Sequence, residues 1–137
     1  MISLILLAGG TGTRMNLDLP KQFLLLAGKP VIMHILERVE RIEKVSEVIV
    51  VSLQSYKDFI IDYIEKYGLR KNYSIVDAGF SRQQSVLNGL LSANYETVII
   101  HEAARPFVKC EDFQELIECK HSNVIFGSMI PHTVLFQ

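Results

Sequence analysis

Residues 2–23 read "ISLILLAGGTGTRMNLDLPKQF" and combine two features that decide the fold. The first seven residues are apolar except for one serine, a composition typical of a strand buried on both faces of a parallel sheet. Glycines at positions 9, 10 and 12 end this run, and Arg14 and Lys21 follow. Exposed backbone N–H groups beside two cations favour an anionic ligand, a phosphate above all. For the glycines alone, a tight turn without a ligand is the alternative.

The composition indicates one globular domain, residues 1–137, with 49% hydrophobic residues to form its core. Fifteen acidic and fourteen basic residues give a net charge of -1, so no broad positive surface is expected for nucleic acid or a membrane. Cys110 and Cys119 lack the spacing of a disulfide framework or a zinc site. No segment resembles a signal peptide or a membrane span, and we expect a cytoplasmic protein.

Short apolar runs alternate with helical patterns along the rest of the chain. Apolar residues at 32, 35, 36, 39 and 42 have the spacing of an amphipathic helix that begins near Pro30. A fourth helix is expected around residues 113–117. The other expected strands are 45–52, 73–79, the start of 97–107, and 123–131.

Two further helices carry possible start signals. Ser55 with Asp58, and Ser81 with Gln84, resemble capping boxes. The first of these helices is expected to run to about Gly68. The second is expected to pack through an apolar face made of Val86, Leu87, Leu90 and Leu91.

This alternation predicts right-handed βαβ units and a mainly parallel sheet with helices on both faces. Ligands of such sheets bind outside the carboxyl ends of the strands. Three chemically unusual segments follow the first, third and fourth expected strands. They are "AGGTGTR" (8–14), "AGFSRQQS" (78–85) and "HEAARPF" (101–107), and we expect them to meet in one site.

The glycine segment fits neither of the two common phosphate loops. A Walker A loop needs lysine and Ser/Thr after its last glycine, whereas Thr13 and Arg14 follow Gly12. The dinucleotide fingerprint needs a third glycine that is also missing. The planar guanidinium of Arg14 and the compact charge of Lys21 both suit a polyphosphate, with a solvated surface pair as the alternative.

Three segments in the same order resemble one enzyme family: "LAGGTGTRMNLDLPKQF" (7–23), "AGFSRQQSVLNGL" (78–90) and "VIIHEAARPFV" (98–108). The family comprises cytidylyltransferases of the 2-C-methyl-D-erythritol 4-phosphate and ribitol 5-phosphate type, which join CTP to a sugar-alcohol phosphate and release diphosphate. The resemblance implies an α/β fold, a three-layer Rossmann-like nucleotidyltransferase domain with a doubly wound, mainly parallel sheet. It also implies CTP and a polyol phosphate as ligands, and Mg²⁺ or another divalent cation as cofactor. Methylerythritol phosphate, used in isoprenoid precursor synthesis, is the first choice of acceptor.

The resemblance also assigns roles to individual residues. Arg14 and Lys21 match cations that stabilise charge on the α-phosphate during transfer, and Glu102 stands where the family has a Mg²⁺-binding aspartate. Ser85 as an ordinary helix serine, and Arg82 as a residue that fixes its loop, are the alternatives at those positions. The matched nucleotide-binding positions are Ala8, Gly9, Gly10, Thr11 and Gly12 for the phosphates, Gly79 and Ser85 for cytosine, and Ala103 near the ribose.

His101 is adjacent to Glu102, but neighbouring strand residues point to opposite faces, which favours a structural role for the histidine.

The chain departs from the family at two places. Glu102 is one methylene longer than the family's aspartate, which alters the metal position. The final "IPHTVLFQ" (130–137) stops before the family's acceptor contacts and dimerising arm, which favours a fragment over a natural short protein and leaves a homodimer undecided. A non-catalytic CTP-binding remnant, or a nucleotidyltransferase for another base or sugar phosphate, therefore stays an alternative.

Overall fold

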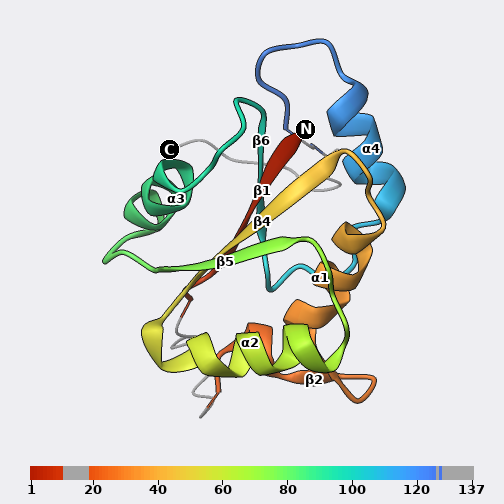
Figure 1. Cartoon of the computed structure of the whole chain (residues 1–137). Helices are drawn as coiled ribbons and strands as arrows, with labels where there is room; N and C mark the ends of the chain where they lie inside the picture. Colours follow the sequence, from red (N-terminus) through yellow and green to blue (C-terminus); the bar gives the residue numbers. More distant parts are fainter. Residues whose placement is uncertain (11–18, 126, 128–137) are drawn as a thin grey trace, which may run out of the picture.

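The computed structural model describes residues 1–10, 19–125 and 127 (Figure 1). Its strands and helices alternate along most of the chain, as the sequence predicts. The strands are β1 (Ile2–Ala8), β2 (Leu25–Leu26), β3 (Lys29–Pro30), β4 (Val45–Ser52), β5 (Asn72–Asp77) and β6 (Val98–Glu102). The α-helices are α1 (Val31–Glu40), α2 (Lys57–Lys66), α3 (Arg82–Leu91) and α4 (Cys110–Glu118), with short 3-10 turns η2 (Lys21–Phe23) and η3 (Gln54–Tyr56).

Strand β1 lies inside a parallel sheet with the order β5-β4-β1-β6. All seven of its residues are buried, which explains its nearly continuous apolar sequence. The register pairs Ala8 with Ser52, Ser52 with Asp77, and Leu7 with Glu102. The four carboxyl ends are therefore aligned, and the segments that follow β1, β5 and β6 leave the sheet at the same edge.

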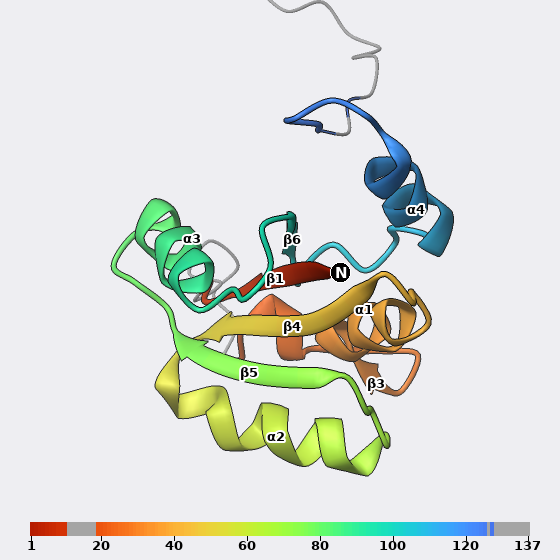
Figure 2. The ribbon, with the colours of Figure 1, turned by 45° about the horizontal axis from the view of Figure 1, so that its top comes forward.

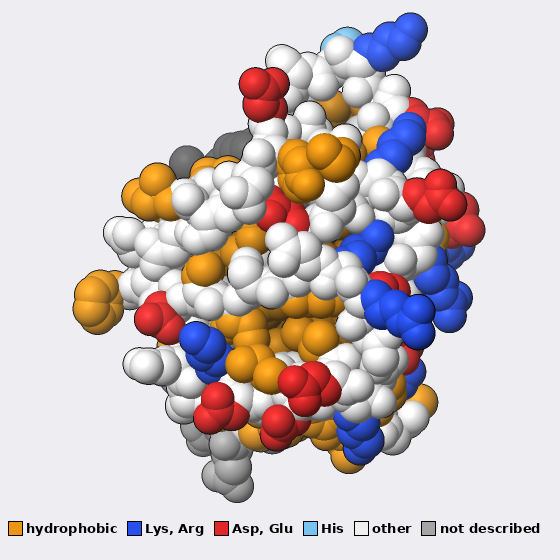
Figure 3. Space-filling model, in the orientation of Figure 1, with side chains coloured by type: hydrophobic (Ala, Val, Ile, Leu, Met, Phe, Trp, Pro, Cys, Tyr) orange, Lys and Arg blue, Asp and Glu red, His pale blue; other side chains and the backbone are white. Residues whose placement is uncertain are grey.

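Helices cover both faces of the sheet, which makes three layers (Figure 2). Leu4 and Leu6 of β1 pack in a core with residues of α1, α2 and α4, whereas Ile5 and Leu7 point the other way toward α3. On the face shown in Figure 3, apolar side chains gather between β5 and α2, and acidic and basic side chains are intermixed around them. The expected α/β, doubly wound architecture is confirmed.

Most sequence-based boundaries are confirmed, but the start of α2 is not. Strands β1 and β4 have the predicted bounds, and α1 begins directly after Pro30. The predicted Ser55–Asp58 capping box is wrong, because the turn η3 comes first and Tyr56 caps α2 without a side-chain hydrogen bond.

Ser81 does cap α3, and its Oγ accepts a hydrogen bond from the Gln84 backbone N–H at 3.1 Å. The Gln84 side chain instead donates to Asn88 Oδ1, so only half of the predicted box forms.

The predicted apolar face of α3 is mostly wrong. Val86 packs against the sheet, but Leu87, Leu90 and Leu91 are 47%, 42% and 77% exposed. The helix contacts the sheet through its small residues instead. A Cβ on Gly89 would lie 2.6 Å from Ile5 Cγ2, so the missing side chain allows the helix backbone to lie directly on β1.

The predicted strand over 123–131 is also wrong where it can be compared. Residues 123–125 and 127 have no strand conformation, and the Ile125 side chain is 90% exposed. An apolar sequence favours a strand only where a neighbouring strand and a core can accept it. The other residues of this segment lie outside the described part of the chain.

None of the helices in the described residues combines the length and the apolar character needed to cross a bilayer.

Candidate functional site

The three unusual segments meet in one cleft at the carboxyl edge of the sheet, as predicted. The cleft has a volume of about 410 Å³. Its floor is the backbone that leaves β1, and its walls come from the turn before α3 and from the end of β6. The lining residues include Gly9 and Gly10, Leu53, Gly79 to Arg82, Ser85 and Glu102.

Gln22 holds the start of the glycine segment. Its Nε2 donates to the carbonyl oxygens of Ala8 and Gly10 at 2.6 and 2.9 Å, and its side chain is buried. Phe23 fixes the same turn in the core and stacks on Tyr56, with 4.4 Å between ring centroids. A buried amide needs partners, so these two bonds set the backbone conformation beside the cleft.

Gln22 was not among the functional residues predicted from the sequence. The only available signal was its position between the predicted cation Lys21 and an aromatic residue, and this signal does not reveal its two carbonyl partners.

Two glycines allow close packing beside the cleft, and Gly9 brings the first and second segments together. A Cβ on Gly9 would lie 2.5 Å from Ala78 Cβ, closer than carbon atoms can approach. A Cβ on Gly79 would lie 2.1 Å from Gln84 Cγ. Both positions therefore require glycine for close packing, and the segment after β1 lies against the turn between β5 and α3.

Ser85 shapes that same turn. Its Oγ accepts a hydrogen bond from the Gly79 N–H at 3.0 Å and donates to the Ser81 carbonyl oxygen at 2.9 Å. A hydroxyl has one donor and two acceptor positions, so one acceptor position is left for a ligand. The predicted contact with cytosine stays a prediction, and the observed contacts show that Ser85 also has a structural role.

Glu102 forms an ion pair across the cleft with Arg82. The Arg82 Nε donates to Glu102 Oε1 at 2.9 Å, and the two side chains are 65% and 38% exposed. Arg82 thus ties the start of α3 to the end of β6, in agreement with the loop-fixing role considered from the sequence. Because Arg82 contacts Glu102, the predicted metal ligand, the position of Arg82 also affects the charge at the proposed metal site.

The metal prediction can be compared with the available ligands. Among the described residues, no three His, Cys, Asp or Glu side chains are grouped closely enough to hold an ion. Glu102 is the single carboxylate among the described residues that line the first cleft. This arrangement fits Mg²⁺, which commonly takes one or two carboxylates together with substrate phosphates and water.

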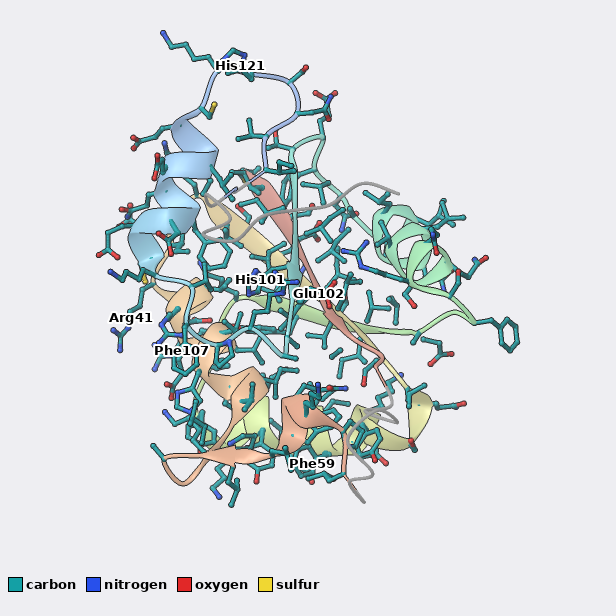
Figure 4. All side chains as sticks on the ribbon, turned by 180° about the vertical axis from the view of Figure 1, so that it is seen from behind. Arg41, Phe59, His101, Glu102, Phe107 and His121 are labelled. Atoms are coloured by element: carbon teal, nitrogen blue, oxygen red, sulfur yellow. The ribbon has the colours of Figure 1, made fainter. Side chains whose placement is uncertain are left out.

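His101 points to the opposite side of β6 from Glu102 (Figure 4). Its Nε2–H donates to the Arg105 carbonyl oxygen at 3.1 Å, and its ring meets the Phe113 ring edge-on at 5.4 Å between centroids. Burial lowers the pKa of His101, and the neighbouring Arg105 charge lowers it further. A neutral histidine that orients the loop after β6 agrees with the structural role expected from the sequence.

A second cleft of about 820 Å³ lies on the other side of the ion pair. Arg82 and Glu102 line both clefts, and Arg105 lines the second. Arg38 of α1 donates to the Pro106 carbonyl oxygen and so helps to hold the loop that carries Arg105. Arg82 and Arg105 place positive charge in this second cleft, and Glu102 and Asp112 place negative charge there.

The other predicted site residues are distributed as follows. Ala8 and Ala103 are buried at the ends of β1 and β6, where the Ala103 N–H donates to the Leu7 carbonyl oxygen at 2.9 Å. Lys21 is exposed on η2 and is not among the residues that line the first cleft. Thr11, Gly12 and Arg14 lie outside the described residues.

Known proteins provide an independent comparison. A solved structure titled 4-diphosphocytidyl-2C-methyl-D-erythritol synthase, from Anaerococcus prevotii, superposes with a TM-score of 0.73 and 28% identity over 85% of this chain and 49% of that one. A 2-C-methyl-D-erythritol 4-phosphate cytidylyltransferase from Clostridium botulinum is 40% identical over 119 residues. One from Chlamydia pneumoniae is 37% identical over 134 residues.

These alignments cover 85% and 96% of this chain, but 52% and 60% of the two relatives. The chain thus spans little more than half the length of these relatives. The family defined by 2-C-methyl-D-erythritol 4-phosphate cytidylyltransferase matches residues 2–132, which include all three segments of the cleft. The chain therefore belongs to the 2-C-methyl-D-erythritol 4-phosphate cytidylyltransferase family.

Proposed function

We propose that this chain provides the nucleotide-binding part of a cytidylyltransferase. The enzyme would transfer CMP from CTP to a sugar-alcohol phosphate, with 2-C-methyl-D-erythritol 4-phosphate as the first choice, and release diphosphate. The observation that carries this proposal is the meeting of the three family-like segments around one cleft. The cleft volume of about 410 Å³ lies within the usual range for small-molecule sites.

The chain divides the recognition of CTP among these segments. Backbone groups of Gly9 and Gly10 are proposed to bind the phosphates, and the same role is proposed for Thr11 and Gly12, which lie outside the described residues. Arg14 and Lys21 are proposed to neutralise charge as the α-phosphorus becomes five-coordinate. The turn at Gly79 and Ser85 binds cytosine, and Ala103 lies near the ribose. The bonds from Gln22 support this assignment, because they fix the backbone that must approach the phosphates.

Glu102 is the proposed carboxylate ligand of Mg²⁺. The bound ion would supply positive charge to the phosphate oxygens and so reduce the repulsion between two anionic reactants. The protein contributes the carboxylate, the position of that carboxylate at the end of β6, and the nearby Arg82.

Only part of the acceptor site is proposed in the second cleft, where Arg105 can face the acceptor phosphate. An ionised phosphate oxygen attacks the α-phosphorus of CTP, and the bond from that phosphorus to the oxygen bridging to the β-phosphate breaks. Diphosphate leaves with the electron pair. The nucleophile is already ionised near neutral pH, so the site needs positioning and charge neutralisation rather than a general base.

A diphosphate-release assay tests this function directly. The purified chain is incubated with CTP, Mg²⁺ and either methylerythritol phosphate or ribitol 5-phosphate, and CTP binding is measured separately by calorimetry. Diphosphate release that depends on the acceptor supports the transferase, and the faster acceptor identifies the substrate. UTP and ATP in place of CTP test the choice of base.

The second candidate function is a CTP-binding domain without turnover of its own. It is favoured by one observation, namely that the predicted cation Lys21 is exposed and is not among the residues that line the first cleft. CTP binding without diphosphate release would support this candidate. Failure to bind CTP at millimolar concentration would contradict both.

A further inference from the structure

We propose that Arg82 acts as an internal counter-cation that competes with a divalent metal ion for Glu102 and turns toward the nucleotide phosphates when the metal displaces it. The inference deepens the proposed function and rests on its metal site. It assigns Arg82 a binding and positioning role in the cleft, in addition to fixing its loop. The contacts of the Arg82–Glu102 pair carry the argument.

The pair stands where the two clefts adjoin. Arg82 is the first residue of α3, and Glu102 is the last residue of β6. Both side chains line the first cleft and the second cleft. A change in this ion pair would therefore alter both the nucleotide cleft and the proposed acceptor cleft.

A metal ion and Arg82 cannot both interact with Glu102 at full strength. The guanidinium already donates to Oε1 at 2.9 Å, and a dication on the same carboxylate would lie close to the arginine charge. The pair is weakly held, because side chains exposed by 65% and 38% are screened by water. A divalent ion can therefore displace Arg82 with little loss of stability.

Once displaced, Arg82 is suited to a phosphate. Its contact with Glu102 uses Nε, and the guanidinium has five N–H donors in a planar fork that matches phosphate oxygens. Arg82 lines the first cleft together with Gly9 and Gly10, so the proposed phosphate region lies within the same cavity. Arrival of the metal would thus release a cation for the nucleotide, and the two ligands would bind cooperatively.

The competition between Arg82 and the metal ion depends on the length of the Glu102 side chain. Replacing glutamate by aspartate withdraws the carboxylate by about one C–C bond, or roughly 1.5 Å. The contact with Arg82, now 2.9 Å, would be lost, while a carboxylate would still be available to a metal ion. Glu102→Asp should therefore separate competition from coordination.

The test uses Mn²⁺ as the probe, with free Mn²⁺ measured by electron paramagnetic resonance. Without nucleotide, Arg82→Gln should increase Mn²⁺ affinity about two- to fivefold, because an exposed competing ion pair is removed. Arg82→Lys should bring the affinity back toward the wild-type value, since it restores the charge. Arg41→Gln is the matched control, because Arg41 is exposed and lies far from Glu102 (Figure 4).

The affinity for CTP should change in the opposite direction to the affinity for Mn²⁺. In calorimetry, Arg82→Gln should weaken CTP binding severalfold, although it strengthens Mn²⁺ binding. A purely structural role for Arg82 would weaken both ligands, and thermal unfolding of each variant monitors the fold. Glu102→Asp provides a second route should Arg82→Gln fail to fold, and it should also strengthen Mn²⁺ binding, with no further gain in the double variant.

Two results would overturn the proposal. If the wild type binds Mn²⁺ with CTP, and neither Arg82→Gln nor Glu102→Asp strengthens Mn²⁺ binding, the competition is wrong while the proposed metal site stands. If neither the wild type with CTP nor the variants bind Mn²⁺, the metal site itself is wrong and the competition falls with it.

Discussion

Two glutamates at opposite ends of the same sheet show how this fold separates structure from function. Glu47, near the amino end of β4, is 3% exposed and accepts hydrogen bonds from Ser3 Oγ at 2.5 Å and from the Asn94 N–H and Nδ2 at 2.7 Å each. Glu102, at the carboxyl end of β6, is partly exposed and contacts Arg82. The first carboxylate accepts hydrogen bonds from neutral donors, and the second pairs with an exposed cation.

The difference follows from the cost of burying a charge. A buried carboxylate is tolerated only when hydrogen bonds replace its lost water, and Glu47 has three such bonds from two segments. They tie the loop after α3 to β1 and β4, and Ser3 Oγ also accepts from the Tyr95 N–H. A ligand could not displace these donors without opening the loop, whereas a ligand can exchange with Arg82.

The largest expected effect is on stability, from Glu47→Gln. The amide can keep fewer of these hydrogen bonds than the carboxylate, because its NH₂ group cannot accept from Ser3 or Asn94. We expect a loss of about 2–4 kcal/mol in the free energy of unfolding, measured by urea denaturation. Glu96→Gln, an exposed glutamate nearby, is the control and should change stability by less than about 0.5 kcal/mol. A loss no larger than that of the control would show that the network is not structural.

The pH dependence of stability should follow from the same network. Burial raises the pKa of Glu47, but the hydrogen bonds from Ser3 and Asn94 outweigh it, and the pKa is lowered from its ordinary value of 4.5. A lowered folded-state pKa means that the unfolded chain binds the proton first, so this stabilisation is present above pH 4.5 and is lost as pH falls through the folded-state pKa.

Glu40 contributes in the same direction, because hydrogen bonds from Tyr73 and from backbone N–H groups outweigh its burial and lower its pKa. Urea denaturation at several pH values below 7 should show the loss, and Glu47→Gln should flatten it. An unchanged slope in that variant would assign the acid sensitivity to other groups.

The variant Gln22→Leu tests whether buried hydrogen bonds also stabilise the carboxyl edge of the sheet, where the first cleft lies. Gln22→Leu removes both hydrogen bonds to the glycine segment and leaves two carbonyl oxygens without this partner. We expect a loss of about 1–3 kcal/mol in unfolding free energy. CTP affinity should fall about tenfold, because the phosphate-binding backbone is no longer fixed.

Gln54→Leu, at an exposed glutamine of η3, is the control for Gln22→Leu. Lower stability with unchanged CTP affinity would separate Gln22 from the ligand.

The features of the fold and of the site that depend on local sequence pattern could be predicted from the sequence. The apolar runs predicted the bounds of β1 and β4 correctly. The rule that ligands bind at the carboxyl ends of parallel strands predicted that Gly9, Gly79 and Glu102 lie at one edge of the sheet. The partners could not be predicted in the same way. Ser3 and Glu47 are 44 residues apart, and nothing in either local sequence specifies their contact.

The same limit explains the error at α3. Its leucines have helical spacing, but Gly89 determines which side lies on the sheet, because only a residue without a side chain permits that approach to Ile5. Close packing between distant segments decides such details, and hydrophobic periodicity does not encode it.

The smallest expected effect on stability, Glu102→Gln, is the most informative about the site. The variant loses an exposed ion pair, so unfolding free energy should change by less than about 1 kcal/mol. Divalent-ion binding should nevertheless fall by at least about tenfold, because a neutral amide replaces the single proposed carboxylate ligand.

Mn²⁺ titration in the presence of CTP measures the Glu102→Gln loss, and Glu37→Gln, which breaks the ion pair with Lys29 elsewhere on the surface, is the matched control. If Glu102→Gln were as destabilising as Glu47→Gln, both carboxylates would be structural. Loss of metal binding with the fold intact would instead establish that Glu102, at the carboxyl end of the sheet, serves to bind a ligand, whereas Glu47, at the amino end, serves to stabilise the fold.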